Sequence, residues 1–469
     1  MKLTCFCALV LLAALTVLTG CKVGPNYQRP ALDTPASYRF ATHAGTNSLG
    51  DLPWWEVFQD ATLQDLIRAA LTNNYDLRRA MARVEQARNL AVAARAPLLP
   101  QVGYGGGVGR GKNALFNSPT PLNGATESSA LLNLNAAWEI DLWGRIRRLS
   151  EAARAEYLAT DDARRGVTIT LVGDVATAYF QLLQFDEELR IQRAATNAYT
   201  ETLRIFNERL TNGIVSQLPS DRATAALANA AAIIPQLEIN VATTENQLAV
   251  LLGRPPGPVA RSSLSRTAQL PPEVPSGLPG SLLQRRPDVL AAEQSLIAAN
   301  ANIGAAKANF FPQIGLTTFF GKVSPELSAF TSGSANAWNI GASLAGPLFQ
   351  GGALRAQYRA AQARFDEAKA GYEQSVQTAF QEVSNALIAR EKLGEVRVYA
   401  GQGVTALTSA VDLSMQRFLQ GLSSYFEVLQ AQQELFPTQR ALAQAQVSEQ
   451  LAVVQLYKAL GGGWQTAPQ

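Results

Sequence analysis

The pattern of apolar and polar positions switches between two periods along the chain. Over residues 132–141 apolar side chains alternate with polar ones, which predicts a strand with one apolar face and one polar face. Residues 338–345 alternate in the same way, residues 314–320 do so more weakly, and the Gly-rich residues 101–110 are the least regular. We therefore predict four amphipathic strands, at about residues 99–110, 130–142, 312–321 and 337–347.

Two long stretches without proline have the other period, at about Arg147–Leu210 and Ala353–Leu419. Their apolar residues recur at intervals of three and four, which predicts long α-helices with heptad-like seams. The seam positions are Val172, Val175, Tyr179 and Leu182 in the first helix and Tyr372, Val376, Ala379, Val383 and Ala386 in the second. Further apolar positions widen each stripe, so each helix can pack on two neighbours, as in a closed cylinder of helices. A coiled-coil hairpin that acts as a spacer is the alternative interpretation.

The chain contains an internal repeat. ARAPLLPQVG at 94–103 is echoed by AKANFFPQIG 212 residues later, and RLTNGIVS at 209–216 by RFLQGLSS 208 residues later. Repeat 1 (61–253) and repeat 2 (281–463) are separated by a Pro/Gly-rich linker (254–280) and followed by a tail (464–469). Each repeat is predicted to hold one ordinary helix, at about Ala61–Ala96 or Ser281–Asn309, then two strands, a long helix, a Gly turn and a return helix.

The N-terminus has the pattern of a lipoprotein leader. Lys2 precedes an apolar run that is too short to span a bilayer, and the run ends in Leu18-Thr19-Gly20-Cys21. This matches the bacterial lipobox, so residues 1–20 are predicted to be a removed signal peptide. Cys21 is then the acylated start of an extended segment (21–60). An ordinary signal peptide with an accidental cysteine is the alternative.

No segment after the leader has 18 uninterrupted apolar residues, so a membrane crossing would need the strands. Four strands cannot close a barrel, and an open edge in lipid leaves backbone groups unpaired at several kcal/mol each. Copies of the chain must then pair their edges. Two copies give eight strands and a filled barrel, whereas three give twelve strands and a lumen. A soluble sandwich sheet with one solvent-exposed face is the alternative, because it shows the same alternation.

Composition argues against several other functions. The net charge of +3 is spread along the chain, which does not favour a nucleic-acid partner. The one histidine, His43, cannot build a histidine metal cluster. Hydrolase, metalloprotease, CxxC and phosphate-loop motifs are absent from the sequence, so we predict no catalytic residues, no metal and no cofactor.

Several segments resemble the outer membrane factor (TolC/NodT-like) family of efflux and secretion channels, in its lipoprotein branch. They are CKVGPNY from Cys21, PWW from Pro53, RRPDVLAAEQSLIAANANIGAAKANFFPQI from Arg285, LFQGG at 348–352 and YKALGGGW at 457–464. The resemblance implies a mainly α protein with a transmembrane β-barrel, formed as a homotrimer with twelve strands, four from each protomer, above a long periplasmic α-helical barrel. It also implies an outer-membrane location, with a periplasmic adaptor (membrane fusion) protein and an inner-membrane RND-type pump as partners.

The resemblance also assigns roles to particular residues. Arg209, Gly213, Arg417 and Gly421 match the helical tip motif that docks the adaptor in this family. Asp412 lies about two helical turns before the second tip, where the family closes its periplasmic mouth, and is a candidate for that aperture. A plain C-cap is the alternative for each glycine, and a solvated helix face is the alternative for Asp412.

The predicted function is therefore the outer-membrane exit channel of a tripartite efflux pump, which passively conducts drugs or other small toxic compounds. An outer-membrane channel for metal efflux or type I secretion is one alternative. A lipid-anchored coiled-coil tether without a pore is another.

Overall fold

The protein is described by a computed structural model that covers residues 22–41, 48–112, 126–263, 277, 279–324, 328–331 and 335–464. It divides into two compact units. The first comprises residues 1–31, 83–161 and 291–373 and holds the β-sheet. The second comprises residues 32–82, 162–290 and 374–469 and holds the hairpin turns between the long helices and their return helices.

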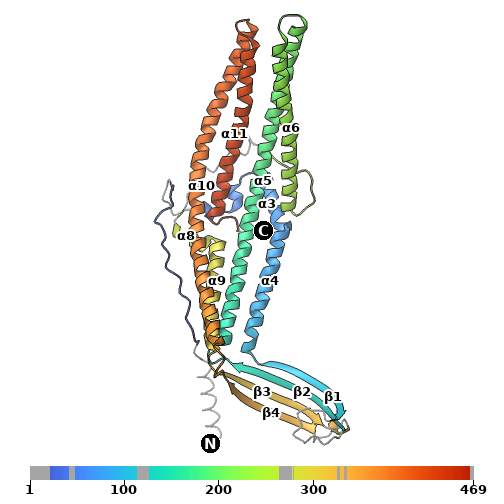
Figure 1. Ribbon diagram of the computed structural model, residues 1–469, viewed down its shortest axis with the longest axis vertical. Coiled ribbons are helices and arrows are strands. Elements are labelled where there is room, and N and C mark those ends of the chain that lie inside the picture. Colours follow the sequence, from blue (N-terminus) through green and yellow to red (C-terminus); the bar gives the residue numbers. More distant parts are fainter. Residues whose placement is uncertain are drawn as a thin grey trace. The chain divides into compact units, whose positions relative to one another are not determined.

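The sheet of the first unit has four antiparallel strands in the order β1-β2-β3-β4 (Figure 1). Their bounds are Gln101–Lys112 (β1), Thr126–Ile140 (β2), Gln313–Ser324 (β3) and Asn336–Ala345 (β4). β2 starts before the predicted residue 130 because its ladder with β1 continues to the Lys112–Thr126 pair. It ends before residue 142 because the Asp141 carboxylate accepts hydrogen bonds from the amides of Ile146 and Arg147, and so caps the helix that follows.

The N-terminal segment of the first unit lies along α5 (Arg145–Thr211) and α9 (Pro287–Ala308). Gly24 is in the left-handed region at φ 95°, and a Cβ added there would be 2.5 Å from the Cα of Gly304. The buried Arg148 side chain donates hydrogen bonds to the Gly24 carbonyl and to the Asn26 side chain. Farther along, the Tyr27 hydroxyl and the Arg29 guanidinium both donate to the Glu293 carboxylate. Side chains of the helices thus hold an extended strap that has no regular hydrogen bonding of its own.

Two long helices and their return helices form hairpins (Figure 1). α5 (Arg145–Thr211) leads to α6 (Gln217–Leu251), and α10 (Ala353–Leu419) leads to α11 (Tyr425–Ala459). Each bound in the second pair lies 208 residues after its counterpart in the first pair, and β3 lies 212 residues after β1. The sequence repeat is therefore a repeat of whole structural elements.

The two helices of ordinary length are interrupted, contrary to the prediction of one continuous helix in each repeat. The first is split into α3 (Ala61–Asn73) and α4 (Tyr75–Arg95) because Asn74 is extended and its side chain accepts from the Leu77 amide. The second is split into α8 (Pro279–Arg285) and α9 (Pro287–Ala308). Arg286 lies between them, and a residue that precedes a proline disfavours helical geometry. The short elements are η1 (Leu49–Asp51), α2 (Trp54–Val57), η2 (Ala96–Leu98) and η3 (Ser328–Thr331).

The predicted seams are the buried faces of α5 and α10. Every seam position is at most 6% exposed, and Tyr179 and Tyr372 are at 0%. Two helices, α5 and α6, also contain windows apolar enough for a membrane span, and the window in α5 is 67% buried within the protein. Core helices meet the same criterion, so these windows are weak evidence for transmembrane helices.

Candidate functional site

One face of the sheet carries a continuous row of large apolar side chains. The strand register places Tyr104, Leu134, Phe320 and Trp338 side by side across all four strands. Tyr104 is 87% exposed, Phe320 68% and Trp338 72%. The next row on this face also ends on an exposed β4 side chain, Ile340. A large apolar surface of this kind is costly in water and stable in hydrocarbon.

The opposite face of the sheet is mainly polar or small. The rows between the apolar ones contain Asn133, Asn135 and Asn339, and glycines of β1 lie opposite Asn133 and Asn135. Phe319 is the aromatic exception on this face, in the same row as Asn135 and Asn339. The sheet therefore has the alternation of a barrel wall that separates lipid from a water-filled lumen.

The outer strands of the sheet leave two edges open. β1 pairs only with β2 and β4 only with β3 among the described residues. The strands have 12, 15, 12 and 10 residues, which is enough to cross a bilayer, since tilted transmembrane strands need about 9–11 residues. An open edge cannot persist in lipid, so the two edges define where further strands must add.

Aromatic residues fix the end of the sheet that joins the helices. The rings of Trp143 and Phe311 are stacked with centroids 4.6 Å apart, and the Trp143 indole donates to the Pro312 carbonyl at 2.8 Å. Phe349 lies exposed in the segment between β4 and α10. Trp143, Phe310, Phe311 and Phe349 lie near strand ends, where membrane barrels carry girdles of aromatic residues. Tyr104 belongs instead to the apolar row within the sheet.

Gly213 and Gly421 form the hairpin turns in the second unit. Their φ angles are +68° and +73°, in the left-handed region that favours glycine. The amide of Ile214 donates to the Arg209 carbonyl, and the amide of Leu422 donates to the Arg417 carbonyl. These bonds close α5 and α10 in Schellman-type caps, so the matched residues of the two tips have the same structural role.

The structure also brings the two tips together through contacts that the sequence did not indicate. The Arg209 guanidinium lies 4.7 Å from the centre of the Phe418 ring, which stands edge-on to Tyr425. Tyr425 also contacts Phe206, and its hydroxyl shares a hydrogen bond with Thr202. Arg209 therefore connects one hairpin to the other.

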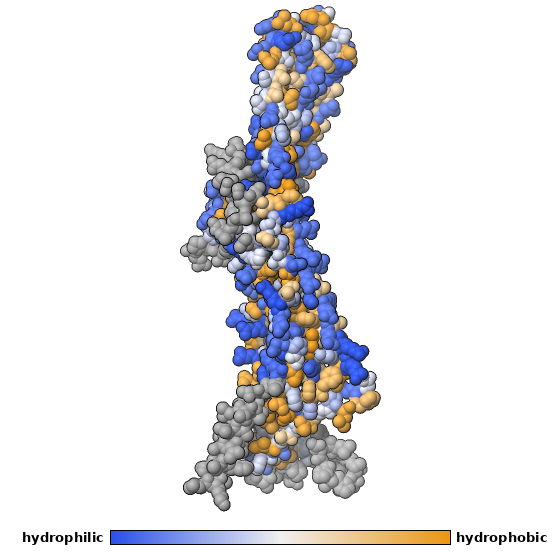
Figure 2. Space-filling view, turned by 90° about the vertical axis from the view of Figure 1, so that its left-hand side faces the viewer, coloured by the Kyte–Doolittle hydropathy of each residue, from blue (hydrophilic) through white to orange (hydrophobic). Residues whose placement is uncertain are grey.

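Apolar side chains are exposed around these turns. Figure 2 shows such residues interrupting the polar surface at the hairpin end of the molecule. They include Ile214, Leu218, Leu419, Leu422 and Phe426, each at least 49% exposed. A patch of this kind is typical of a protein-interaction surface, and sequence analysis did not identify it because it assigned docking to the turn motif alone.

The remaining predicted site residues have simple surroundings or fall outside the description. Asp412 is exposed on α10. Cys21, the leader and His43 lie outside the described residues. Within the part of the chain that the structure describes, no group of three or more His, Cys, Asp or Glu side chains could hold a metal ion.

A half-buried polar cluster around Asp60 in the second unit has a structural role. Its carboxylate accepts hydrogen bonds from the Tyr179 hydroxyl at 2.7 Å and the Ser262 hydroxyl at 2.6 Å, and from two amides at the start of α3. Burial opposes ionisation, but these hydrogen bonds hold the pKa of Asp60 below its ordinary value. Burial also raises the pKa of Tyr179 to about 12. One carboxylate oxygen caps α3 and the other accepts from the Tyr179 and Ser262 hydroxyls, so the cluster ties three segments of the second unit together.

A two-faced sheet with open edges, joined to long helical hairpins, is characteristic of channel proteins that combine a membrane β-barrel with a helical duct. The family model described as outer membrane efflux protein matches residues 66–254 and 278–462, which cover most of both repeats. The chain belongs to this family of outer-membrane efflux channels.

Relatives and solved structures agree with this assignment. The chain is 38% identical to the solvent efflux pump outer membrane protein SrpC of Pseudomonas putida, over 96% of this chain and 97% of the relative. It is 34% identical to the cation efflux system protein CusC of Escherichia coli O6:H1, over 98% and 99%. The structure of the open state of the Neisseria gonorrhoeae MtrE outer membrane channel matches with a TM-score of 0.86 at 31% identity, over 95% of this chain and 99% of that one.

These findings confirm the predicted fold and class of function. The protein is a TolC-like outer-membrane efflux channel with a periplasmic helical portion, and it is a transport protein rather than an enzyme. As the outer-membrane component of an efflux pump, it works with the other pump components.

Proposed function

We propose that three copies of this chain form the exit duct of a tripartite pump. The observation that carries this proposal is the sheet with one exposed apolar face and two open edges. Three copies supply twelve strands, which close a barrel wide enough for a lumen. Purified protein in a planar bilayer should give stable conductance steps. A mature protein that stays monomeric and gives no conductance would contradict the proposal.

The cargo that we propose is a range of drugs, solvents or other small toxic compounds, delivered by an RND-type inner-membrane pump through a periplasmic adaptor. The relatives that support this are named as solvent, toluene and antibiotic efflux proteins. Deleting the gene should lower the growth-inhibitory concentration of toluene and of amphiphilic antibiotics, and the plasmid-borne gene should restore it.

Metal efflux is the second candidate because CusC, named as a cation efflux protein, matches over nearly the whole chain. The same deletion strain separates the two candidates. Hypersensitivity to copper or silver alone would favour metal cargo, and hypersensitivity to toluene and antibiotics alone would favour organic cargo. A type I secretion role would instead appear as loss of a secreted protein from the culture medium.

We also propose that Cys21 carries the lipid anchor of the mature protein in the outer membrane. The support is the lipobox that ends at this cysteine. Mass spectrometry of the mature N-terminus should find a diacylglyceryl thioether and an acylated amine on Cys21. An unmodified thiol, or a mature chain that begins at another residue, would exclude this anchor.

The hairpin tips are the proposed docking site for the adaptor, through Arg209, Gly213, Arg417 and Gly421. Exposed apolar side chains around the two caps support this role. Asp412 is the proposed aperture residue, because three copies around one axis would bring like charges together at a constriction. Replacing Asp412 by asparagine should lower the cation selectivity of the pore, measured as a reversal potential in a salt gradient. An unchanged reversal potential would place Asp412 outside the constriction.

A further inference from the structure

Two basic residues lie on the apolar face of the sheet, toward its loop end, which is the end away from the helices. Lys322 follows Phe320 by two residues on β3, and Arg110 follows Tyr104 by six residues on β1. Even spacings along a strand keep side chains on one face, so both cations share the face of the apolar row. A cation on a lipid-facing surface is costly in the middle of the hydrocarbon and tolerated near its edge. The depth of these two residues therefore decides what they can contact.

The strand register gives this depth. On the apolar face, the row of Ile314 at the helix end and the next three rows, up to that of Phe320, contain no charged residue. Lys322 lies eight residues beyond Ile314. With a strand tilt of about 40° this is roughly 21 Å across the bilayer, and the apolar band of an outer-membrane barrel is about 25 Å tall. The Lys322 backbone is therefore just inside the outer edge of the band, and Arg110, two rows farther out, is just beyond it.

Both side chains are available to an anion at this level. The Lys322 ammonium donates to the Phe330 carbonyl at 3.1 Å and lies 5.9 Å from the centre of the Phe330 ring. Phe330 belongs to η3, which follows β3 at the loop end, so the lysine side chain is directed out of the hydrocarbon. This bond uses one of the three ammonium donors and leaves two. Arg110 is exposed and makes no ion pair or hydrogen bond within the described part of the chain.

The surroundings of the two cations suit a lipid with an anionic head. No Asp or Glu lies on this face within the bounds of the four strands. Between the cations and the helices the face carries exposed apolar side chains, among them Trp338, Ile340 and Leu344 on β4. A lipid whose phosphate meets Lys322 would therefore direct its acyl chains along these residues, toward the middle of the membrane. The outer leaflet of the outer membrane is lipopolysaccharide, whose phosphate groups lie at the outer edge of the hydrocarbon.

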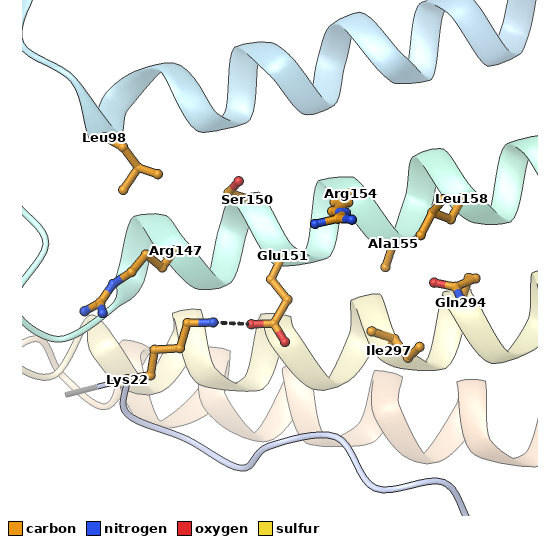
Figure 3. Close-up of a pocket in the computed structure, with 10 residues that line it drawn as sticks. All are labelled: Lys22, Leu98, Arg147, Ser150, Glu151, Arg154, Ala155, Leu158, Gln294 and Ile297. Carbon is orange, nitrogen blue, oxygen red and sulfur yellow. Dashed lines mark hydrogen bonds and ion pairs between the residues drawn. The ribbon is translucent and has the colours of Figure 1, made fainter. Parts of the chain in front are cut away.

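A groove at the helix end of the sheet is less suited to a membrane lipid. It has a volume of about 450 Å³, and Figure 3 shows Glu151 paired with Lys22 at its border. Its apolar residues Leu158 and Ile297 lie farther along the helices from the sheet than Lys22. An acyl chain in this groove would point away from the membrane, whereas the cations at the loop end have their apolar surface on the membrane side.

We propose that Lys322 and Arg110 bind phosphate groups of lipopolysaccharide in the outer leaflet. The arginine and lysine heads supply charge-assisted hydrogen bonds to the phosphates, and the acyl chains lie against the apolar rows. The inference rests on the proposed closure of the sheet into a membrane barrel. Such contacts around the outer rim would fix the height of the barrel in the outer membrane.

The test is lipid binding by the full mature protein in detergent, measured by native mass spectrometry with diphosphoryl lipid A and with lipid A from which the phosphates have been removed. Lys322→Gln and Arg110→Gln should each weaken binding of diphosphoryl lipid A about fivefold, the factor expected for one interfacial charge. Glutamine at 322 keeps a donor for the Phe330 carbonyl, and Lys322→Arg should retain most of the binding. Neither glutamine variant should change binding of the dephosphorylated lipid. Arg95→Gln is the matched control, because it removes an exposed arginine near the helix end of β1.

Four results would overturn the inference. Two of them are equal binding of diphosphoryl lipid A by wild type and the Arg110→Gln, Lys322→Gln double variant, and an equal loss in Arg95→Gln. The third is displacement of the lipid by millimolar inorganic phosphate, which would indicate a simple anion site. The fourth is equally tight binding of phosphatidylglycerol with the same loss in both variants, which would indicate a site for any anionic lipid. Conductance of the same preparations separates this inference from the function. Pores without selectivity for diphosphoryl lipid A would refute only the rim site, whereas absence of pores from the wild type would refute the duct.

Discussion

Arginine substitution at two adjacent phenylalanines tests which face of the sheet meets lipid. Phe319 and Phe320 are neighbours on β3 and point to opposite faces. Phe320 lies in the row with Leu134 and Trp338, and Phe319 lies in the row with Asn135 and Asn339. The pair is matched in size, strand and depth, so the two variants differ mainly in the face that receives the charge.

The expected cost follows from the environment of each face. An arginine on the lipid face of a membrane barrel costs about 2–4 kcal/mol near the bilayer midplane. Phe320 is the eighth of the twelve residues of β3, well inside the strand, so a value in this range is expected. Three copies in one ring would raise the cost to roughly 6–12 kcal/mol. On the polar face, the Phe319→Arg side chain reaches water and asparagine side chains, and its cost should be near zero.

The assay is the amount of heat-modifiable oligomer in isolated outer membranes, together with resistance to exported drugs. Phe320→Arg should assemble poorly and lose resistance, whereas Phe319→Arg should assemble normally and alter only conductance. Equal assembly of the two variants, or poorer assembly of Phe319→Arg, would show that the faces are assigned wrongly.

Two further predictions concern the second unit. Replacing both Gly213 and Gly421 by leucine should abolish drug resistance while oligomers still form, because left-handed backbone costs other residues about 1–2 kcal/mol each. Gly401→Leu within α10 is the control. Normal export by the double variant would contradict the docking proposal. The pKa of Asp60 is lowered in the folded state, so the ionised carboxylate stabilises the fold at pH values above the ordinary carboxyl pKa. This stabilisation of the fold is lost as the pH falls through the lowered pKa. Asp60→Asn keeps an acceptor for the first amides of α3 but removes the charge that accepts from the Tyr179 and Ser262 hydroxyls. It should therefore reduce the hydrogen-exchange stability of the α3 start by about 1 kcal/mol at neutral pH and flatten its dependence on acid, and an unchanged pH profile would contradict this.

Elements with strong periodicity could be predicted from the sequence. The alternation in β2 and β4 predicted these two strands and their faces, and the seam from Val376 to Val383 predicted the buried side of α10. These signals are local, because each side chain's environment is set by the period of its own element. The two interrupted helices were missed, although Pro287 marked the second interruption.

The remaining contacts depend on residues far apart in the chain. Arg148 is buried by the N-terminal strap, and Arg209 reaches the Phe418 ring of the other hairpin. Asp60 meets Ser262 only in the folded chain. None of these residues has a local pattern that identifies its partner, so sequence periodicity could not reveal them.

Edge-to-edge crosslinking tests the central claim most directly. Single cysteines placed on β1 and on β4 of one chain, in a small grid of positions to allow for register, should form disulfides between neighbouring copies in the outer membrane. The account predicts a ladder on non-reducing gels that ends at a covalent trimer. Monomers alone at every grid position, or a ladder that ends at two copies, would contradict a ring of three chains closed through these strands.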